Sequence, residues 1–327
     1  MKTFRKLGLA LSLVCASMSL ASCSQKEEKT KIGILQLLTH GALDSAKEGF
    51  VDGLASAGYV DGENITITYQ NPEADESSMS TMSRSLVRDN EFVLGIATPA
   101  AVALQAAAKS QNSDCKILFT AVTDAVDAKL VASNEAPGGN ITGTSDINPV
   151  KEQIELIKEL LPNATSIGIV YTISETNSKV QADLAEAQIK AMGLNATIAT
   201  ISDATEITSV TRQLISKGID AIYIPTDNTL ASNMPALTNV AYESKIPVVC
   251  GEPNMVTAGG TITLGIDYYR LGQQTAAMLV DMLKNGKTPA TMAVQTQSLT
   301  DCELTVNEAA LTKIGLTLPS SIRDRLS

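Results

Sequence analysis

The chain has 327 residues, of which 44% are hydrophobic, and its formal net charge is −10 at pH 7. An acidic chain without basic clusters is not typical of nucleic-acid-binding proteins, and a single histidine excludes zinc sites built from several histidines, so we expect no nucleic acid, metal or cofactor. The length exceeds the size at which one hydrophobic core usually stops growing, which predicts two domains.

The first residues are typical of a secretion signal. A basic head is followed by an apolar block and by the sequence LASC, which ends at Cys23. This order resembles a bacterial lipobox. It predicts removal of residues 1–22, acylation of Cys23 with fatty acids such as palmitate, and anchoring on the extracytoplasmic face of the cell membrane, with residues 23–30 as a flexible tether. The alternative is an ordinary signal peptide in which Cys23 is one more apolar residue. The apolar block is too short for a membrane-spanning helix.

Strand-like and helical segments alternate from residue 31 onward. Short apolar or alternating runs typical of β-strands occur at 31–36, 65–69, 91–96 and 116–119. Segments with helical spacing lie between them at 42–57, 79–87 and 100–109. Gly58 is placed to end the first of these helices. Regular β-α alternation predicts a parallel sheet covered by helices on both faces.

The pattern then restarts. The run SIGIVY at 166–171 repeats KIGILQ at 31–36, an offset of 135 residues (166 − 31). Gly193 repeats Gly58 at the same offset, and a third strand recurs at 220–224. Residues 134–149 are rich in turn-forming residues and are expected to form a loop-rich crossover. Strands at 247–250 and 261–266, a helix at 270–284 and a mixed tail follow. The sequence therefore predicts an α/β fold of two doubly wound parallel-sheet lobes.

Several motifs resemble one family of substrate-binding lipoproteins of ABC importers, the tryptophan/tyrosine-type binding proteins with the type I periplasmic-binding fold. The motifs are KIGILQL (31–37), THGALD (39–44), EGFVDGL (48–54), GIATPAA (95–101), PGGNITG (137–143), QIELIK (153–158) and PTDNT (225–229). The resemblance extends from Lys31 to about Gln295. Gly41 departs from it, because the family's segment is expected to carry proline there.

The resemblance implies three crossovers between the lobes, near 145–150, 266–268 and 294–297. The N-terminal lobe would then comprise residues 31–147 and about 268–293. The C-terminal lobe would comprise residues 148–267 and about 294–327.

Ligands of open α/β sheets bind outside the carboxyl ends of the strands, and two facing lobes place two such edges across one cleft. The candidate ligand-binding residues at predicted strand ends are Gln36, His40, Thr98, Pro99, Ser145, Asp146, Tyr171, Asp227, Asn228 and Asp267. Thr123, Thr226 and Glu252 lie at strand ends in the same way. In an amino-acid site, Thr98 or Ser145 beside a helix N-terminus suits the carboxylate, and Asp227 or Asp267 suits the ammonium group.

Each of these residues also has a structural interpretation. Thr98, Asp227 and Asp267 lie just before predicted helices and are suited to cap them. Ser145 and Asp146 lie where a hinge turn is expected, and a loop histidine such as His40 commonly serves only as a hydrogen-bonding group. The sequence leaves both interpretations open.

The resemblance implies a binding protein that captures an amino acid, aromatic or otherwise apolar, by hinge closure and delivers it to an ABC permease in the membrane. A sensor lipoprotein of the same fold is an alternative. An enzyme is disfavoured because no GxSxG, HExxH or GxxxxGK[ST] motif occurs. Cys115, Cys250 and Cys302 show no metal or disulfide spacing, and at least two are expected to be buried.

Overall fold

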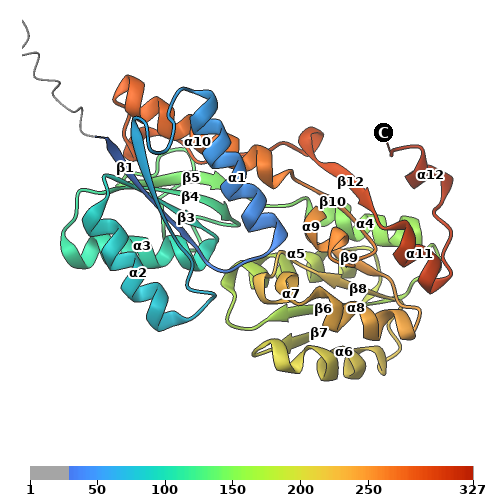
Figure 1. The fold of residues 1–327 in the computed structure, drawn as a ribbon. Coiled ribbons are helices and arrows are strands. Elements are labelled where there is room, and N and C mark those ends of the chain that lie inside the picture. The colour runs from blue at the N-terminus through green and yellow to red at the C-terminus, as the bar shows by residue number, and fades with distance from the viewer. Residues whose placement is uncertain (1–28, 327) are drawn as a thin grey trace, which may run out of the picture.

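The structure is a computed structural model that describes residues 29–326. The expected signal segment and Cys23 lie outside the described residues. Two α/β lobes lie side by side, and each is built around a six-stranded, mostly parallel sheet (Figure 1). The predicted fold class is therefore confirmed.

The first lobe contains an all-parallel sheet whose interior strands are buried on both faces. Its strand order is β11 (Gln295–Thr296), β5 (Ile141–Ser145), β4 (Lys116–Val122), β3 (Phe92–Ile96), β1 (Thr30–Gln36) and β2 (Ile65–Gln70). Helices α1 (Gly41–Ser56) and α10 (Tyr268–Asn285) cover one face, and α2 (Glu76–Asp89) and α3 (Thr98–Gln111) cover the other (Figure 1).

The second lobe repeats this plan with one antiparallel edge strand, β12. Its strand order is β12 (Glu303–Val306), β10 (Ile262–Gly265), β9 (Val248–Cys250), β8 (Ala221–Ile224), β6 (Ser166–Thr172) and β7 (Asn195–Ile201). Helices α4 (Val150–Leu160) and α5 (Thr176–Ala191) close one core, and α6 (Ile207–Ile215) and α8 (Met234–Glu243) close the other.

The remaining elements are short. They are α7 (Asn228–Ser232), α9 (Pro253–Thr257), α11 (Glu308–Ile314), α12 (Ser320–Arg323) and the 3₁₀ turns Ala204–Glu206, Pro289–Thr291 and Leu299–Asp301.

The repeated Ile-Gly-Ile motif has a packing cause in both lobes. A Cβ atom added to Gly33 in β1 would lie 3.0 Å from the side chain of Leu86 in α2. A Cβ atom added to Gly168 in β6 would lie 2.7 Å from the side chain of Leu214 in α6. Each glycine therefore leaves room for a leucine of the helix that crosses its strand, and this close approach explains why the two lobes share the motif.

The chain passes between the lobes from β5 to α4, from β10 to α10 and from β11 to β12. Two expectations need correction. The third crossover begins after Thr296, within the expected range 294–297, but the first lobe extends to Thr296 and not only to about 293, because Gln295 and Thr296 still pair with β5. The loop-rich segment 134–149 contains the buried strand β5, whose short sequence ITGTS lies among turn-forming residues that obscure it.

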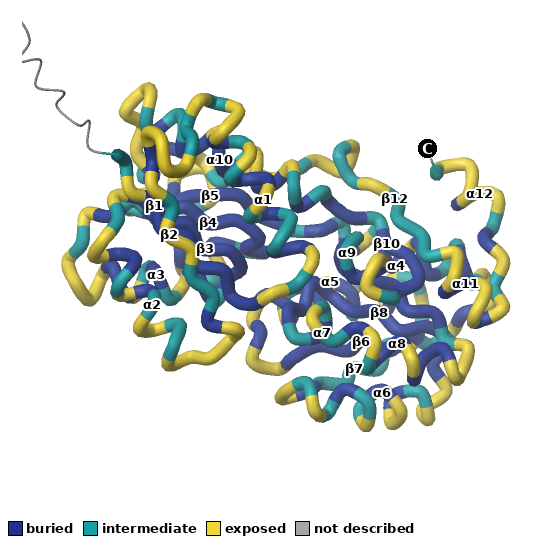
Figure 2. The backbone as a smooth tube through the Cα atoms, viewed as in Figure 1, coloured by how far each residue is buried: buried dark blue, intermediate teal, exposed yellow. Residues whose placement is uncertain are grey.

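Buried backbone is concentrated in the strands, whereas the outer faces of the helices are exposed (Figure 2). Within residues 29–326, no helix combines the length and apolar character needed to cross a membrane.

Candidate ligand-binding site between the two lobes

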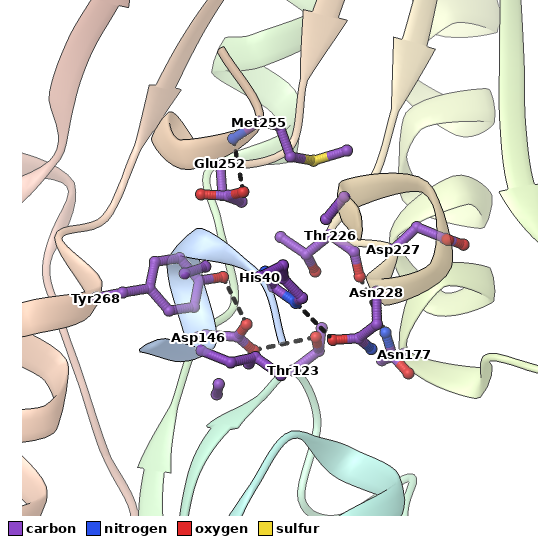
Figure 3. A pocket seen from close by; sticks show the side chains of 14 residues that line it. His40, Thr123, Asp146, Asn177, Thr226, Asp227, Asn228, Glu252, Met255 and Tyr268 are labelled. Carbon is purple, nitrogen blue, oxygen red and sulfur yellow. Dashed lines mark hydrogen bonds between the residues drawn. The ribbon is translucent and has the colours of Figure 1, made fainter. Parts of the chain in front are cut away.

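A cavity lies between the lobes at the carboxyl ends of their strands (Figure 3). Its volume is about 310 Å³, including space that is open to solvent. The lining residues are His40, Ala42, Leu43, Ala121, Thr123, Asp146, Asn177, Thr226, Asp227, Asn228, Ala231, Glu252, Met255 and Tyr268. Both lobes contribute to this set, so a molecule held here would contact both.

The lobes also contact each other directly around the cavity. His40 Nε2 lies 3.2 Å from Asn228 Oδ1, and Gln181 Nε2 donates to Thr123 Oγ1 at 3.3 Å. Ser232 Oγ donates to the carbonyl oxygen of Thr39 at 3.3 Å. These hydrogen bonds join segments that no crossover connects, and with the small free space they describe two lobes closed on each other.

Two non-glycine residues at the edge of the first sheet that faces the second lobe have positive φ. Ala97 follows β3 with φ 82°, and Ala121 near the end of β4 has φ 55°. The register of β4 against β5 shifts between Phe119 and Val122. Positive φ in a residue other than glycine costs of order 1–3 kcal/mol and persists where the surrounding structure holds it. The irregular end of β4 brings Ala121 and Thr123 to the cavity wall.

One end of the cavity is acidic. Asp146 Oδ2 accepts a 2.7 Å hydrogen bond from the hydroxyl of Tyr268, and Asp146 Oδ1 accepts one of 3.1 Å from Thr123 (Figure 3). Glu252 caps α9 and accepts from the backbone N–H groups of Asn254 and Met255 at 2.5 and 2.8 Å.

Burial favours the protonated form of the two carboxyl groups at this end. It raises the pKa of Asp146, and it raises the pKa of Glu252 to about 7, although the hydrogen bonds to Glu252 act in the opposite direction. Because no lysine or arginine occurs among the described lining residues, this end of the cavity favours a cationic group.

Asp227 lines the cavity but its carboxylate is engaged in the protein. It accepts from the backbone N–H of Thr172 at 2.6 Å, from the Thr172 hydroxyl at 2.8 Å and from the backbone N–H of Leu230 at 2.9 Å. It therefore caps α7 and ties that helix to the end of β6. Burial, with the charge of Glu175 as a smaller cause, raises the pKa of Asp227 to about 7.

The other end of the cavity is lined by amide and imidazole groups (Figure 3). Behind it, the carboxylate of Glu175 accepts from the backbone N–H and the side-chain Nδ2 of Asn228 at 2.8 and 2.7 Å. It also accepts from the backbone N–H and the hydroxyl of Thr229 at 2.9 and 2.8 Å. Burial lowers the pKa of His40, which favours the neutral imidazole at this end.

The crossovers beside the cavity are tied to one another by amide side chains. Asn148 Nδ2 donates to the carbonyl of Asp146 at 3.0 Å, and Asn148 Oδ1 accepts from the backbone N–H of Ile266 at 3.1 Å. Gln297 Nε2 donates to the carbonyl of Asp267 at 2.6 Å, and its Oε1 accepts from the backbone N–H of Asp267 at 3.1 Å. The three crossovers thus form one connected strip at the edge of the cavity.

The structure places four of the ten predicted site residues on the cavity wall: His40, Asp146, Asp227 and Asn228. The other six do not line it. They are Gln36, Thr98, Pro99, Ser145, Tyr171 and Asp267.

Local interactions explain several of these outcomes. Gln36 donates to Asp44 and to the carbonyl of Leu38, and the Ser145 hydroxyl donates to the carbonyl of Thr123. Asp267 caps α10, as its alternative interpretation predicted. The capping interpretation of Thr98 is wrong, because Thr98 is the first residue of α3 and its hydroxyl has no partner among the described residues.

Asn177, Met255 and Glu175 were not among the residues predicted from the sequence. Asn177 and Glu175 belong to the polar run that starts α5, which looks like an ordinary helix beginning. Met255 lies in a five-residue helix that the sequence pattern did not predict. Their common signal is a position just after a strand of the second lobe, at the edge where its ligands would lie. Within residues 29–326 no group of three or more His, Cys, Asp or Glu side chains is arranged to hold a metal ion.

The free cysteines follow the expectation from the sequence. Cys115 and Cys250 are buried and Cys302 is partly buried, and each is a free thiol.

Residues 31–325 match the model of the family described as ABC transporter substrate binding protein. The chain belongs to this family. It is 37% identical over 317 residues to a tyrosine-binding protein of Clostridioides difficile, an alignment that covers 95% of this chain and 90% of the relative. The predicted resemblance is thereby confirmed. Members of the family act outside the cytoplasm.

Solved structures agree with this assignment. An ABC domain from Streptococcus pneumoniae in complex with L-Trp has a TM-score of 0.85 at 37% identity, covering 92% of this chain and 99% of that one. A substrate binding protein with adhesive properties from Clostridium difficile, in its ligand-free, open structure, has a TM-score of 0.70 at 38% identity, covering 91% and 98%. The TM-score is thus higher for the structure in complex with L-Trp than for the ligand-free, open structure.

Proposed function

We propose that this protein captures an aromatic amino acid, tryptophan or tyrosine, between its lobes and delivers it to the permease of an ABC importer. The observation that carries the proposal is the cavity that both lobes line. One end of it is acidic, and hydrogen bonds between His40 and Asn228 and between Gln181 and Thr123 hold the lobes together around it. Two relatives above 35% identity support the ligand class, one named for tyrosine and one solved with L-Trp.

The acidic end supplies the partner for the ligand's ammonium group. Asp146 and Glu252 are 4% and 1% exposed, and a desolvated ammonium group needs such carboxylates. This assignment replaces the one expected from the sequence, because Asp267 does not line the cavity and Asp227 already accepts three hydrogen bonds from Thr172 and Leu230.

Ligand binding would also explain the closed arrangement. A molecule that contacts both walls stabilises the closed form relative to the open one, and a permease reads the closed form. Transport, rather than turnover of the ligand, is the function that this design supports.

Thermal denaturation with each of the common amino acids tests the proposal. L-Tryptophan or L-tyrosine at 100 times its Kd is expected to stabilise the protein by about 2.7 kcal/mol. If no amino acid raises the melting temperature, the protein does not bind the proposed ligands.

We also propose that the mature protein is anchored by lipid at Cys23, with residues 23–30 as the tether. The support is the sequence order of basic head, apolar block and LASC. Cys23→Ala is expected to move the protein from the membrane fraction to the soluble fraction while its affinity for the amino acid stays unchanged. Membrane retention of the variant would show that another segment anchors it.

A further inference from the structure

Two residues of the cavity lining each carry a buried side-chain hydrogen-bond acceptor that has no partner among the described residues. The two acceptors are His40 Nδ1 and Asn177 Oδ1. They come from opposite lobes, and both residues line the cavity. A buried polar atom without a partner costs about 1–3 kcal/mol, so each of these atoms requires an explanation.

The orientation of His40 follows from a chain of hydrogen bonds that ends at Glu175. Both oxygens of the Glu175 carboxylate accept backbone N–H groups, at 2.8 Å from Asn228 and at 2.9 Å from Thr229. The Asn228 amide group that lies 2.7 Å from Glu175 must therefore be its NH₂. Its oxygen then faces His40 Nε2 at 3.2 Å, so Nε2 carries the proton.

The neutral imidazole has one proton, and its other nitrogen is an acceptor. Because burial lowers the pKa of His40, the neutral form is the favoured one. Nδ1 therefore presents a lone pair, and it does so only while the lobes are closed, since Asn228 and Glu175 belong to the second lobe.

The orientation of Asn177 is fixed in the same way. Its Nδ2 donates to the carbonyl oxygen of Thr226 at 2.9 Å, and a carbonyl can only accept. The side-chain oxygen is therefore the free end. Asn177 is 7% exposed, so this acceptor is desolvated.

We infer that His40 Nδ1 and Asn177 Oδ1 form an acceptor pair that selects ligands whose side chain carries an N–H or O–H donor. The inference rests on the proposed function and adds a specificity that it does not contain. Asp146 and Glu252 already provide for an ammonium group at the other end of the cavity, which leaves the acceptor pair for the ligand's side chain (Figure 3). An indole N–H or a phenol O–H supplies one donor to these acceptors, whereas a phenyl ring supplies none.

The test compares ligands that differ by the donor alone. Calorimetric titration gives the Kd of the purified protein for L-tryptophan and for β-(3-benzothienyl)-L-alanine, in which sulfur replaces the ring N–H, and for L-tyrosine and L-phenylalanine. The wild-type protein is expected to prefer the donor-bearing member of at least one pair by tenfold or more.

Variants test whether the preference for the donor-bearing ligand depends on the two acceptors. His40→Gln places an amide where Nε2 lies and removes the acceptor at Nδ1, so the preference is expected to fall at least tenfold. His40→Asn places its amide at the Nδ1 position and is expected to retain more of the preference while binding less tightly, because the contact to Asn228 is lost. Asn177→Ala is expected to reduce the preference as well. Gln274→Met is the control, because Gln274 Oε1 is another buried acceptor without a described partner, but Gln274 does not line the cavity.

The single histidine provides a readout that needs no variant. In protein labelled with ¹⁵N-histidine and purified without a polyhistidine tag, the Nδ1 resonance is expected to be that of an unprotonated nitrogen. It should shift between the complexes with L-tryptophan and with the benzothienyl analogue.

Equal Kd values within both ligand pairs, or preferences unchanged in both His40→Gln and Asn177→Ala, would overturn the inference while leaving the proposed function intact. Failure of every aromatic amino acid to bind would instead refute the proposed function and the inference with it.

Discussion

The hydroxyl of Tyr268 donates a 2.7 Å hydrogen bond to Asp146, and this bond joins two of the three crossovers between the lobes. Tyr268 opens α10 directly after the second crossover, and Asp146 lies at the start of the first. Both side chains are buried, at 3% and 4% exposure. The position of the acidic end of the cavity is therefore tied to the hinge itself.

Tyr268→Phe is expected to lower the free energy of unfolding by about 1–3 kcal/mol and to weaken amino-acid binding. The carboxylate of Asp146 would keep one side-chain donor, Thr123, and a buried acceptor that loses its partner incurs its desolvation cost. Urea denaturation and calorimetric titration measure the two effects. Unchanged stability and unchanged affinity would show that the bond is incidental to hinge and site.

The stability of the ligand-free protein is expected to fall as the pH rises from about 4.5 to 7. Burial raises the pKa of Glu252 to about 7 in the folded state, above the ordinary glutamate value of 4.5. The folded state then binds more protons than the unfolded state in this window, so stability is lost with rising pH by at most about 1.4 kcal/mol per pH unit for one proton.

Asp227 titrates in the same range and contributes in the same direction. Urea denaturation at several pH values should therefore give a smaller slope for Glu252→Gln than for the wild-type protein. The same slope in both proteins would mean that Glu252 is ionised throughout.

Amino-acid binding is expected to release protons between pH 6 and 7. An ammonium group placed beside Glu252 favours its ionised form and lowers its pKa, so a proton leaves when the ligand enters. Calorimetric titration in buffers of different ionisation enthalpy counts the protons, and the count should fall in Glu252→Gln. Proton uptake on binding would contradict the assignment of the acidic end to the ammonium group.

Two glycines set the spacing of α1 and α10. A Cβ atom at Gly49 would lie 1.9 Å from the carbonyl oxygen of Tyr269, and one at Gly272 would lie 2.0 Å from that of Ala46. Gly49→Ala and Gly272→Ala are each expected to lower the free energy of unfolding by about 1–3 kcal/mol or more, because the helices must separate.

Gly139→Ala is the matched control for these variants, since no atom lies within 4 Å of its added Cβ and its φ is not positive. Chemical denaturation of the three variants should separate the control from the other two. A Gly49→Ala protein as stable as the control would show that α1 and α10 pack with more freedom than this spacing indicates.

The sequence was informative wherever a local pattern has one physical cause. The Ile-Gly-Ile repeat reflects a leucine packed over each glycine, so it predicted two equivalent lobes. Strand β5 was missed because Thr142 and Thr144 are buried by contacts with distant segments, through hydrogen bonds to Met292 and Thr275. A pattern that depends on partners more than 100 residues away leaves no periodic signal in its own segment.

In the candidate site, too, the residues with a local signal were predicted and those that depend on distant partners were not. His40, Asp146, Asp227 and Asn228 were predicted because strand ends face the cleft in any open α/β sheet. Asn177 was not, because its role depends on the carbonyl of Thr226, which accepts from its Nδ2 and leaves its oxygen without a partner among the described residues. Asp227 and Asp267 were expected to take an ammonium group, but Asp267 does not line the cavity and Asp227 accepts three hydrogen bonds from Thr172 and Leu230.

The position of α10 in the chain has a consequence for the order of folding. The first lobe is interrupted after β5 and is completed only by α10, which buries Leu271, Leu279 and Met282 against it. The second lobe is completed still later in the chain, since β12 and α11 supply its edge strand and part of its core. Neither core can close on a chain that lacks its last sixty or so residues. Synthesis is therefore nearly complete before either lobe can fold, and the late contacts between distant segments slow folding further.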